Sequence, residues 1–468
     1  MSFWTLEHIK GLLGGTWLAR PDPSAARRPI DGVGTDTRTL KPGQVFFALR
    51  GERTDGHAHL TQAVAAGSPL LVIDSGDAPA GAWAVLKVPS TSAALLRLAQ
   101  AYRRTLETTQ VIAVAGSNGK TTTVRMIQSV LSKSLRGSAS IKSFNNAVGV
   151  PLTILAAKRG DRYLICEVGT NAPGEIAQLA SVIEPDIGVI TSIGREHLEG
   201  LGSLRGVAAE ESSLFASLRK GGVAIINADA PLLRENMRPG TWPNVGSIVR
   251  FGFAEDADLR VTGATQDESG VAFAINGRGA YRVGMLGLHN ASNAAAAIGV
   301  ARRLGVENAD IEAGLRDCRG PDMRLESIEA GGVRFINDAY NANPDSMLAA
   351  LATFDALETP AGARRVIVLG DMLELGEAGD GAHDEIVAAA ERARADARIG
   401  VGPRFGAAIA RAKAPWQTAS EAPGAAASLR RGDVVLLKGS RGIGLERIIS
   451  ALHSPGTEPK AAATTTAS

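Results

Sequence analysis

Cysteine is scarce in this chain, and neither sign of charge dominates it. The two cysteines, Cys166 and Cys318, are too few for a disulfide framework, so we expect both to be small buried residues, as in a reduced cytoplasm. The 50 basic and 48 acidic side chains leave a net charge of +2, which gives no field for nucleic acid or a membrane surface. No apolar run approaches the roughly 18 residues of a membrane-spanning helix. Residues 1–10 also lack the apolar segment of a signal peptide. We therefore predict a soluble cytoplasmic protein that neither binds nucleic acid nor inserts into a membrane.

The length of 468 residues exceeds what one hydrophobic core normally supports, and the pattern along the chain predicts an α/β fold with three domains. We expect a small N-terminal domain over residues 1–108 and a central domain over 109–322. A smaller Rossmann-like domain over 323–453 and a disordered tail over 454–468 complete the chain. Strands and helices alternate in the central segment, which is typical of a parallel sheet with helices on both faces.

Apolar periodicity gives the expected elements in more detail. We expect strands at residues 45–49, 70–73, 111–114, 163–168, 186–191, 223–227, 335–338, 365–369, 397–401 and 434–438, and helices at 93–102, 290–304, 346–357, 383–394, 405–413 and 445–452. Short glycine-rich strands between residues 251 and 281 predict a small antiparallel insert. Because ligands of parallel sheets lie beyond the carboxyl ends of the strands, the residues that follow these strands are the candidate site.

The strongest functional signal is the turn over residues 115–123, here called the phosphate turn, which reads Ala-Gly-Ser-Asn-Gly-Lys-Thr-Thr-Thr. It lies between an apolar strand and an amphipathic helix, whose free N–H groups and dipole favour an anion. Gly116 and Gly119 would let the backbone approach phosphate oxygens, Lys120 would reach the terminal phosphates, and the Thr121 hydroxyl would hold Mg²⁺. The spacing Gly-x-x-Gly-Lys-Thr is shorter than that of the usual P-loop. The alternative is a chance Gly/Lys turn, but the flanking elements favour nucleotide binding.

Two further strand ends carry polar groups that suit a metal ion. Glu167 ends the strand at 163–168, beside the phosphate turn, and its carboxylate could bind Mg²⁺ or simply be solvated. His197 follows another strand, and Glu196 and Glu199 beside it keep a metal role open. A structural histidine is equally consistent with the sequence.

The helix after His197 has an inward-facing carboxylate. Its apolar stripe includes Val207, and Glu211 lies four residues further on the same stripe, while Glu210 points about 100° away. A carboxylate on an inward face must be paired or bound to a cation. The alternative is a glutamate at the edge of the stripe that reaches solvent.

The third segment also ends its strands in polar turns. Residues 337–344 read Asn-Asp-Ala-Tyr-Asn-Ala-Asn-Pro, and residues 438–442 read Lys-Gly-Ser-Arg-Gly. The basic Lys438 and Arg441 would suit an anionic substrate, although a solvated charge pair is the ordinary explanation.

Taken together, these stretches resemble the Mur ligases, the ATP-dependent amide-bond-forming enzymes of peptidoglycan synthesis. The family's motifs are matched in order by residues 116–122, Glu167, the loop around His197, and residues 287–293, 323–326, 338–344 and 438–441. Residues 143–151, 167–176 and 369–376 resemble, in particular, the member that joins D-alanyl-D-alanine to UDP-N-acetylmuramoyl-tripeptide. The resemblance runs from about residue 30 to 450.

The resemblance implies a role for each matched residue. ATP would be bound by Gly116, Ser117, Asn118, Gly119, Lys120, Thr121 and Thr122, by Asn290 and Asn293 near the adenine, and by Arg324, Asp338 and Asn343. Mg²⁺ would be bound by Thr121, Glu167 and His197. Catalysis would depend on Lys120, His197 and Arg324. The substrates would contact Thr37 and Arg38 at the UDP end, and Asn145, Asn146, Tyr340, Lys438, Ser440 and Arg441 elsewhere. A monomer is expected, which phosphorylates the tripeptide carboxylate and then lets the D-alanyl-D-alanine amine attack the acyl phosphate.

One departure from the family concerns the helix after the His motif. The family commonly carries there a lysine that CO₂ converts to a carbamate, whereas residues 207–215 of this chain contain no lysine. We hypothesise that Glu211 supplies the anionic oxygen directly, as ligand to a second Mg²⁺ with His197. The enzyme should then not need bicarbonate.

Three other functions compete with this interpretation. Folylpolyglutamate synthetase shares the phosphate turn, but residues 145–151 and a full N-terminal domain disfavour it. A neighbouring Mur ligase that adds the diamino acid is disfavoured by the same specific motifs. A nucleotide-dependent switch protein is disfavoured by the separate third domain with its polar strand ends.

Overall fold

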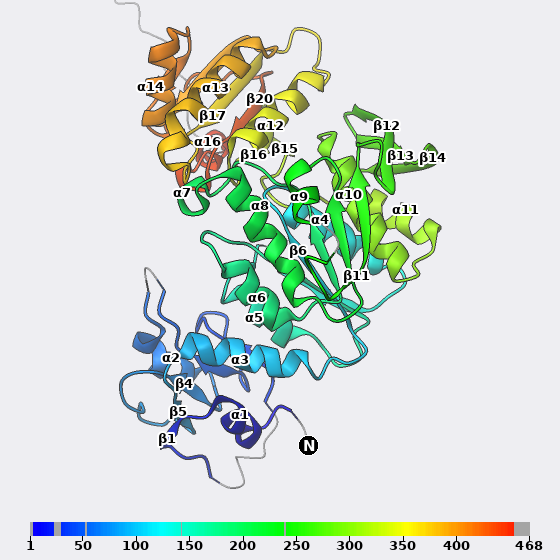
Figure 1. Ribbon diagram of the computed structural model, residues 1–468. Helices are drawn as coiled ribbons and strands as arrows, with labels where there is room; N and C mark the ends of the chain where they lie inside the picture. Colours follow the sequence, from blue (N-terminus) through cyan, green and yellow to red (C-terminus); the bar gives the residue numbers. More distant parts are fainter. Residues whose placement is uncertain (1–2, 23–29, 52–53, 142, 238–239, 454–468) are drawn as a thin grey trace, which may run out of the picture. The chain divides into compact units, whose positions relative to one another are not determined.

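The computed structural model describes residues 3–22, 30–51, 54–141, 143–237 and 240–453. The chain forms two compact units, one of Met1–Gly263, Phe273–Val283 and Ala291–Cys318, the other of Ala264–Ala272, Gly284–Asn290 and Arg319–Ser468. Within the described residues the strands form three sheets, of five, nine and six strands. Helices accompany each sheet (Figure 1). The predicted α/β class is confirmed. The division of the first unit into N-terminal and central domains stays a prediction, and the expected tail lies outside the described residues.

The N-terminal sheet has the order β1-β5-β4-β3-β2. Its strand β1 pairs antiparallel with β5, and the other neighbours pair in parallel. The elements are β1 (Thr16–Ala19), β2 (Val33–Gly34), β3 (Val45–Phe47), β4 (Leu71–Ile73), β5 (Val85–Lys87), α1 (Leu6–Leu13), α2 (Leu60–Ala65) and α3 (Thr91–Arg103). The strands predicted at 45–49 and 70–73 and the helix predicted at 93–102 are confirmed.

The central sheet has the order β14-β13-β12-β11-β10-β9-β6-β8-β7. Its strands are β6 (Gln110–Ala115), β7 (Gly137–Ala139), β8 (Tyr163–Glu167), β9 (Ile187–Ile190), β10 (Gly222–Asn227), β11 (Val245–Gly252), β12 (Leu259–Asp267), β13 (Gly270–Ile275) and β14 (Arg278–Val283). The inner strands are parallel, and β6 lies between β9 and β8. The register places Val114 opposite Glu167 and Ala115 opposite Ile190, so these three strands end at the same edge.

The strands predicted as a separate insert belong to the central sheet. Strands β12, β13 and β14 are successive neighbours that extend the sheet beyond β11. Strand β11 itself pairs in parallel with β10 and β12. The short glycine-rich strands therefore extend the central sheet. They can do so because the edge of β11 has backbone N–H and C=O groups with which β12 can pair.

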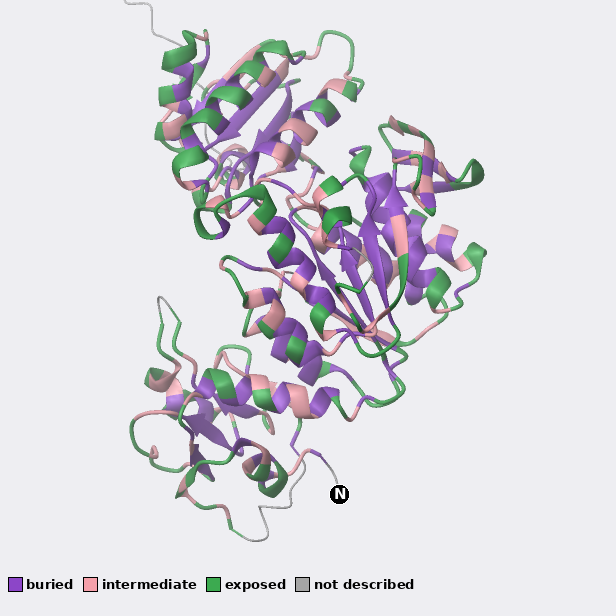
Figure 2. Ribbon diagram, in the orientation of Figure 1, coloured by how far each residue is buried: buried purple, intermediate pink, exposed green. Residues whose placement is uncertain are grey.

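The helices that follow β6, from α4 to α11, accompany the central sheet. They are α4 (Lys120–Leu131), α5 (Gly149–Ala156), α6 (Glu175–Ile183), α7 (Leu198–Leu201), α8 (Leu204–Ser212), α9 (Pro231–Asn236), α10 (His289–Arg303) and α11 (Asn308–Asp317). Helix α4 directly follows β6 and packs against β6 and β8. Figure 2 shows the inner strands of this sheet as a buried layer, whereas β11, β12 and β14 also carry exposed residues.

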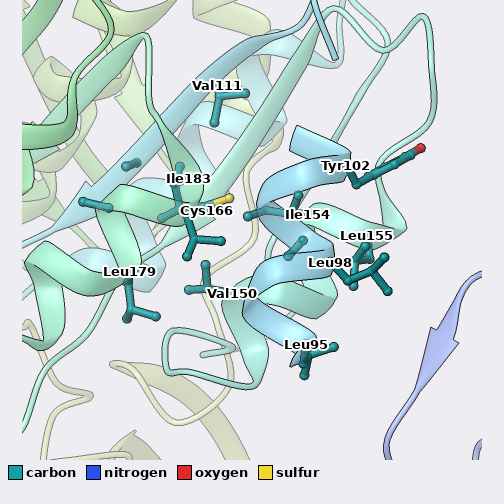
Figure 3. Close-up of a cluster of buried hydrophobic side chains, with 14 of the residues drawn as sticks. Leu95, Leu98, Tyr102, Val111, Val150, Ile154, Leu155, Cys166, Leu179 and Ile183 are labelled. Carbon is teal, nitrogen blue, oxygen red and sulfur yellow. The ribbon is translucent and has the colours of Figure 1, made fainter. Parts of the chain in front are cut away.

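An apolar cluster joins α3 of the N-terminal segment to the central segment (Figure 3). Its residues include Leu95, Leu98 and Tyr102 of α3, Val150, Ile154 and Leu155 of α5, and Leu179 and Ile183 of α6. The Tyr102 hydroxyl also donates a hydrogen bond to the carbonyl oxygen of Ala157, at 2.7 Å. Each buried side chain of this kind contributes about 1.5–3 kcal/mol, so the cluster fixes α3 firmly on α5 and α6.

The sheet of the second unit has the order β15-β16-β20-β17-β18-β19. Its strands are β15 (Glu326–Ala330), β16 (Val333–Asp338), β17 (Arg365–Gly370), β18 (Ala397–Val401), β19 (Gln417–Ala419) and β20 (Val434–Lys438), and its helices are α12 (Pro344–Ala356), α13 (Gly379–Arg392), α14 (Pro403–Ala412), α15 (Ala422–Ala426) and α16 (Glu446–His453). Apolar clusters cover both faces. The predicted elements are confirmed, whereas the short β15, β19 and α15 were not predicted.

Two expectations from composition can be compared with the structure. Cys166 and Cys318, both within the described residues, are buried and free of disulfides, as expected. In the part of the chain that the structure describes, no helix combines the length and apolar character needed to cross a membrane.

Candidate functional site

The phosphate turn connects β6 to α4, as the sequence predicts. Its glycines have φ angles of 120° at Gly116 and 86° at Gly119, which other residues adopt only with strain. A Cβ atom on Gly116 would collide with the side chain of Thr191, and one on Gly119 with the side-chain amide of Asn293. Both glycines are therefore required by conformation and by close packing.

The loop that follows β9 (residues 191–197) lies against the phosphate turn. The Thr191 hydroxyl donates to the carbonyl oxygen of Asn118, at 2.6 Å. The Ser192 hydroxyl accepts from the N–H of Asn118, at 2.8 Å, and the N–H of Ser117 donates to the carbonyl of Ser192, at 2.9 Å. These hydrogen bonds join the two loops into one rigid arrangement.

Lys120 is the first residue of α4, and its side chain lies back over the phosphate turn. Its Nζ donates to the carbonyl oxygens of Gly116, at 2.5 Å, and Ser117, at 3.2 Å. It also lies 3.4 Å from Oε1 of Glu196. Burial raises the pKa of the Glu196 carboxyl, and the charge of Lys120 opposes this effect. The lysine thus lies at the turn, beside a buried carboxylate that the sequence analysis did not select.

Glu211 is buried on α8, as its helical phase predicts, with only 1% of its surface exposed. Its Oε2 accepts a hydrogen bond from the N–H of Gly116, at 2.7 Å. Burial raises the pKa of Glu211 to about 8, while nearby Lys120 lowers it and Glu196 raises it further. A deprotonated Glu211 would therefore need a cation beside it, which Lys120 and a metal ion can supply.

Glu210 is also buried, although its helical phase differs from that of Glu211. Its Oε2 accepts from the N–H of Gly174, at 2.7 Å, and its Oε1 from the N–H of Ile176, at 2.8 Å. These N–H groups belong to the N-terminal end of α6, whose free donors and dipole favour a carboxylate. Glu210 therefore holds α8 against α6.

Thr121, at the beginning of α4, and Glu167, at the end of β8, are oxygen ligands predicted for Mg²⁺. The Thr121 hydroxyl is 3.3 Å from that of Ser143, and Oε1 of Glu167 accepts from the side-chain amide of Asn145, at 3.0 Å. Mg²⁺ in nucleotide sites commonly uses one or two protein oxygens, with water and phosphate completing its shell. A carboxylate and a hydroxyl beside the phosphate turn fit that requirement.

The predicted metal ligands do not form a cluster made by protein side chains alone. Among the described residues, no three His, Cys, Asp or Glu side chains are grouped so as to hold a metal ion. His197 begins α7 with a φ of 49°, and its Nε2 is 3.9 Å from Oε2 of Glu196. Glu199, in contrast, is exposed. Of the two acidic neighbours of His197, the structure directs Glu196 into the site.

Two other predicted residues of the first unit, Asn146 and Arg38, have local partners. Asn146 accepts from the N–H groups of Val148 and Gly149 at the beginning of α5, at 3.1 and 2.9 Å. Arg38 is exposed and forms an ion pair with Asp36, at 2.6 Å. Hydrogen bonds from Arg38 lower the pKa of Asp36 to about 2.

In the second unit, Lys438 is buried, which contradicts the solvated charge pair considered from the sequence. Its Nζ lies 2.8 Å from Oδ2 of Asp338 and donates to the carbonyl of Asn341, at 2.7 Å. The pair forms because β16 and β20 are parallel neighbours, with Asp338 opposite Lys438 at their carboxyl ends. Oδ1 of Asp338 accepts from the N–H of Leu325, at 3.2 Å. Lys438 therefore acts within the fold as the partner of Asp338.

Arg324 and Tyr340 also come together in this unit. The guanidinium carbon of Arg324 lies 4.4 Å from the centre of the Tyr340 ring, a cation–π contact. The residues on either side of Arg324, Met323 and Leu325, both have positive φ angles, of 57° and 52°. Residues held in the left-handed region, as on both sides of Arg324, are common at functional sites.

Four further residues of the second unit have structural contacts. Asn343 caps α12 by accepting from the N–H of Ser346, at 2.8 Å. Ser440 accepts from the N–H of Leu373, at 3.0 Å, and Arg441 forms an ion pair with Glu446, at 3.3 Å. The side-chain amide of Asn290 donates to the carbonyl of Leu286, at 2.7 Å.

Sequence reasoning missed Thr191 and Ser192 beside the phosphate turn, and it named Glu196 only together with Glu199, as a neighbour of His197. Thr191 and Ser192 could have been found, because they follow β9, and β9 pairs with β6, the strand that leads into the phosphate turn. Nothing in the sequence distinguishes Glu196 from Glu199, because the fold of the 191–197 loop decides which of them is buried.

The chain matches known families and proteins over most of its length. Three family models match: "Mur ligase family, catalytic domain" over residues 29–103, "Mur ligase middle domain" over 114–301, and "Mur ligase, glutamate ligase domain" over 323–441. The chain is similar to the UDP-N-acetylmuramoyl-tripeptide–D-alanyl-D-alanine ligase of Bacillus subtilis, at 36% identity over 96% of this chain and 98% of the relative. It is similar to the Escherichia coli protein of the same name, at 32% identity over 97% of this chain and 99% of the relative.

A solved structure gives the same result. The crystal structure of MurF from Acinetobacter baumannii superimposes with a TM-score of 0.86 at 29% identity, and the match covers 96% of this chain and 98% of that one. The phosphate turn, its lysine and the strand-end carboxylate thus lie in a chain that these models and relatives match over nearly its whole length. The chain belongs to the Mur ligase family.

Proposed function

We propose that the protein is an ATP-dependent ligase that joins D-alanyl-D-alanine to UDP-N-acetylmuramoyl-tripeptide, a cytoplasmic step of peptidoglycan precursor synthesis. The phosphate turn, with Lys120 beside Glu196 and Glu211, is the observation that carries the ATP-dependent chemistry. The two substrates, UDP-N-acetylmuramoyl-tripeptide and D-alanyl-D-alanine, are inferred from the names of the relatives. These relatives are 32–36% identical over 96–97% of this chain. ATP and a UDP-linked precursor are both cytoplasmic compounds, and we expect a monomer.

The reaction has two steps. An oxygen of the tripeptide carboxylate attacks the γ-phosphorus of ATP, the bond to the bridging oxygen breaks, and ADP leaves. The D-alanyl-D-alanine amine then attacks the carbonyl carbon of the acyl phosphate, loses a proton, and expels inorganic phosphate. Because the carboxylate and the γ-phosphate are both anionic, the first step needs fixed positive charge. Lys120 at the phosphate turn provides that charge.

The residues that would hold Mg²⁺ are Thr121, Glu167, His197 and Glu211. Bound there, Mg²⁺ would neutralise phosphate charge and orient the γ-phosphate for in-line transfer. Glu211 would supply directly the anionic oxygen that a carbamylated lysine supplies elsewhere in the family. Its burial, its hydrogen bond to Gly116 and the nearby charge of Lys120 support this role.

The other predicted residues would hold the substrates and the nucleotide. Thr37 and Arg38 would bind the UDP end, and Asn145 and Asn146 would lie near the tripeptide. The nucleotide would also contact Asn290, Asn293, Arg324, Asp338 and Asn343, while Tyr340, Lys438, Ser440 and Arg441 would contact the substrates. The Asp36–Arg38 ion pair supports the first assignment, because it holds an exposed guanidinium in one place.

The decisive experiment measures phosphate release with ATP, Mg²⁺ and UDP-N-acetylmuramoyl-tripeptide, with and without D-alanyl-D-alanine. We expect release that needs both substrates, with D-alanyl-D-alanine better than D-alanine or glutamate. Release with folate and glutamate would identify a folylpolyglutamate synthetase, and release with neither substrate would identify a nucleotide switch. Either result would overturn the proposal.

A further inference from the structure

Glu196 is a buried carboxylate beside the phosphate turn, and the reaction outlined above gives it no role. Its side chain is 6% exposed, and its Oε1 lies 3.4 Å from Nζ of Lys120. Glu196 lies in the loop after β9 and Lys120 at the beginning of α4, 76 positions apart in the chain. A buried carboxylate that meets the lysine of a phosphate site can control where the lysine's charge lies.

The position of Glu196 is fixed relative to the phosphate turn. Its N–H donates to the carbonyl of Gly194, at 2.9 Å, and the N–H of Gly194 donates to the hydroxyl of Ser117, at 2.8 Å. Ser117 is itself a residue of the phosphate turn. The carboxylate and the lysine are therefore held by one hydrogen-bonded arrangement, and their contact does not depend on a mobile surface side chain.

We propose that Glu196 is a positioning residue for Lys120, which holds the ammonium group over the phosphate turn and balances its charge until the terminal phosphate of ATP replaces it as counter-ion. This inference rests on the proposed function, because it takes ATP as the nucleotide that occupies the turn. It adds a residue that the predicted site does not contain.

The proposal has two opposite consequences. Glu196 competes with phosphate for the ammonium group of Lys120, so it weakens the binding of ATP in the ground state. It also fixes the direction from which the ammonium approaches, so it favours the geometry needed for phosphoryl transfer. Removal of the carboxylate charge should therefore tighten nucleotide binding and slow turnover at the same time.

The test is Glu196→Gln, which keeps the size of the side chain and removes its charge. We measure the dissociation constant of a non-hydrolysable ATP analogue with Mg²⁺, and kcat for phosphate release with both substrates. We expect the analogue to bind about three- to tenfold more tightly, because the carboxylate no longer competes with phosphate for Lys120. We expect kcat to fall about tenfold, because the charge-assisted hydrogen bond that directs the ammonium group is lost. Glu199→Gln is the matched control, because Glu199 is exposed three residues further along, and it should change neither value.

Several outcomes would overturn the proposal. Weaker nucleotide binding together with lower kcat and a lower melting temperature would mean that Glu196 only supports the fold. A change in one of the two values alone, or in neither, would mean that it does not position Lys120. If Glu196→Gln does not fold, Glu196→Asp keeps the charge but withdraws it by one methylene, and the same opposite shifts should follow in smaller size. Failure of the wild-type protein to bind the analogue would instead contradict the proposed function.

Discussion

The carboxylate of Glu211 accepts a hydrogen bond from the backbone N–H of Gly116, across 2.7 Å and 95 residues of sequence. This contact joins α8 to the first glycine of the phosphate turn. It places a buried carboxyl group near Lys120, where, on the proposed function, the phosphates of a bound nucleotide and their cation would lie. If Glu211 only supports the fold, its replacement should not change how activity depends on Mg²⁺. If Glu211 is a ligand to Mg²⁺, its replacement should change that dependence.

We expect Glu211→Ala to lower the rate of phosphate release at limiting Mg²⁺ by about tenfold or more, since a charged ligand to a cation is lost. Saturating Mg²⁺ should recover part of the rate. The measurement is a titration of Mg²⁺ at fixed ATP and saturating substrates. Glu210→Gln is the control on the same helix, because Glu210 binds the end of α6, and its loss should lower the melting temperature without changing the dependence on Mg²⁺. Full activity of Glu211→Ala at limiting Mg²⁺ would show that our hypothesis for Glu211 is wrong.

Independence from bicarbonate is a separate prediction. Because Glu211 carries a carboxylate of its own, activity should be the same in CO₂-depleted buffer as in buffer with added bicarbonate. The informative variant is Glu211→Lys. Its lysine would have to react with CO₂ to become a carbamate, so the variant should lose activity in CO₂-depleted buffer and regain it with bicarbonate. Phosphate release is measured in both buffers. Rescue of the depleted wild-type protein by bicarbonate would contradict the prediction.

Local patterns were sufficient for part of the site. The phosphate turn and Glu167 follow from strand ends and glycine spacing, and the burial of Glu211 follows from the helical phase of α8. The contacts of Glu196 and Glu210 could not be predicted, because each depends on a loop or helix end that approaches from elsewhere in the chain. Such contacts are set by tertiary packing and leave no periodic signal in the sequence.

Lys438 shows the same limit for charge. A lysine followed by glycine and serine is typical of an exposed turn, and a solvated side chain was the ordinary expectation. The order of strands in the sheet brings Asp338 opposite it, and the pair joins a buried lysine to a partly buried carboxylate. Polar motifs at strand ends therefore predict where a site lies more reliably than they predict which side chains are exposed in it.

We expect Lys438→Met to lower the free energy of unfolding by roughly 3–5 kcal/mol, because it leaves the carboxylate of Asp338 without its buried partner. The measurement is urea denaturation followed by circular dichroism. Lys438→Met combined with Asp338→Leu should recover part of the loss, since neither charge then remains. Arg411→Met removes one partner of an exposed ion pair in the same unit and should change stability little. If Lys438→Met and Arg411→Met lower the free energy of unfolding by similar amounts, burial does not determine how much an ion pair's loss costs.

The two thiols should be inert in the folded protein. Burial raises the pKa of Cys166 to about 12 and that of Cys318 to about 11, from an ordinary value near 9. Since the folded-state pKa values are the higher ones, the stability linked to the neutral thiols is complete below pH 9 and is lost as the pH rises towards 11–12.

At pH 8 iodoacetamide should therefore modify neither cysteine until urea unfolds the chain, and mass spectrometry can follow the modification. The variant Glu199→Cys, at an exposed position, should react at pH 8 without urea. Rapid modification of Cys166 under native conditions would show that β8 opens more readily than its burial implies.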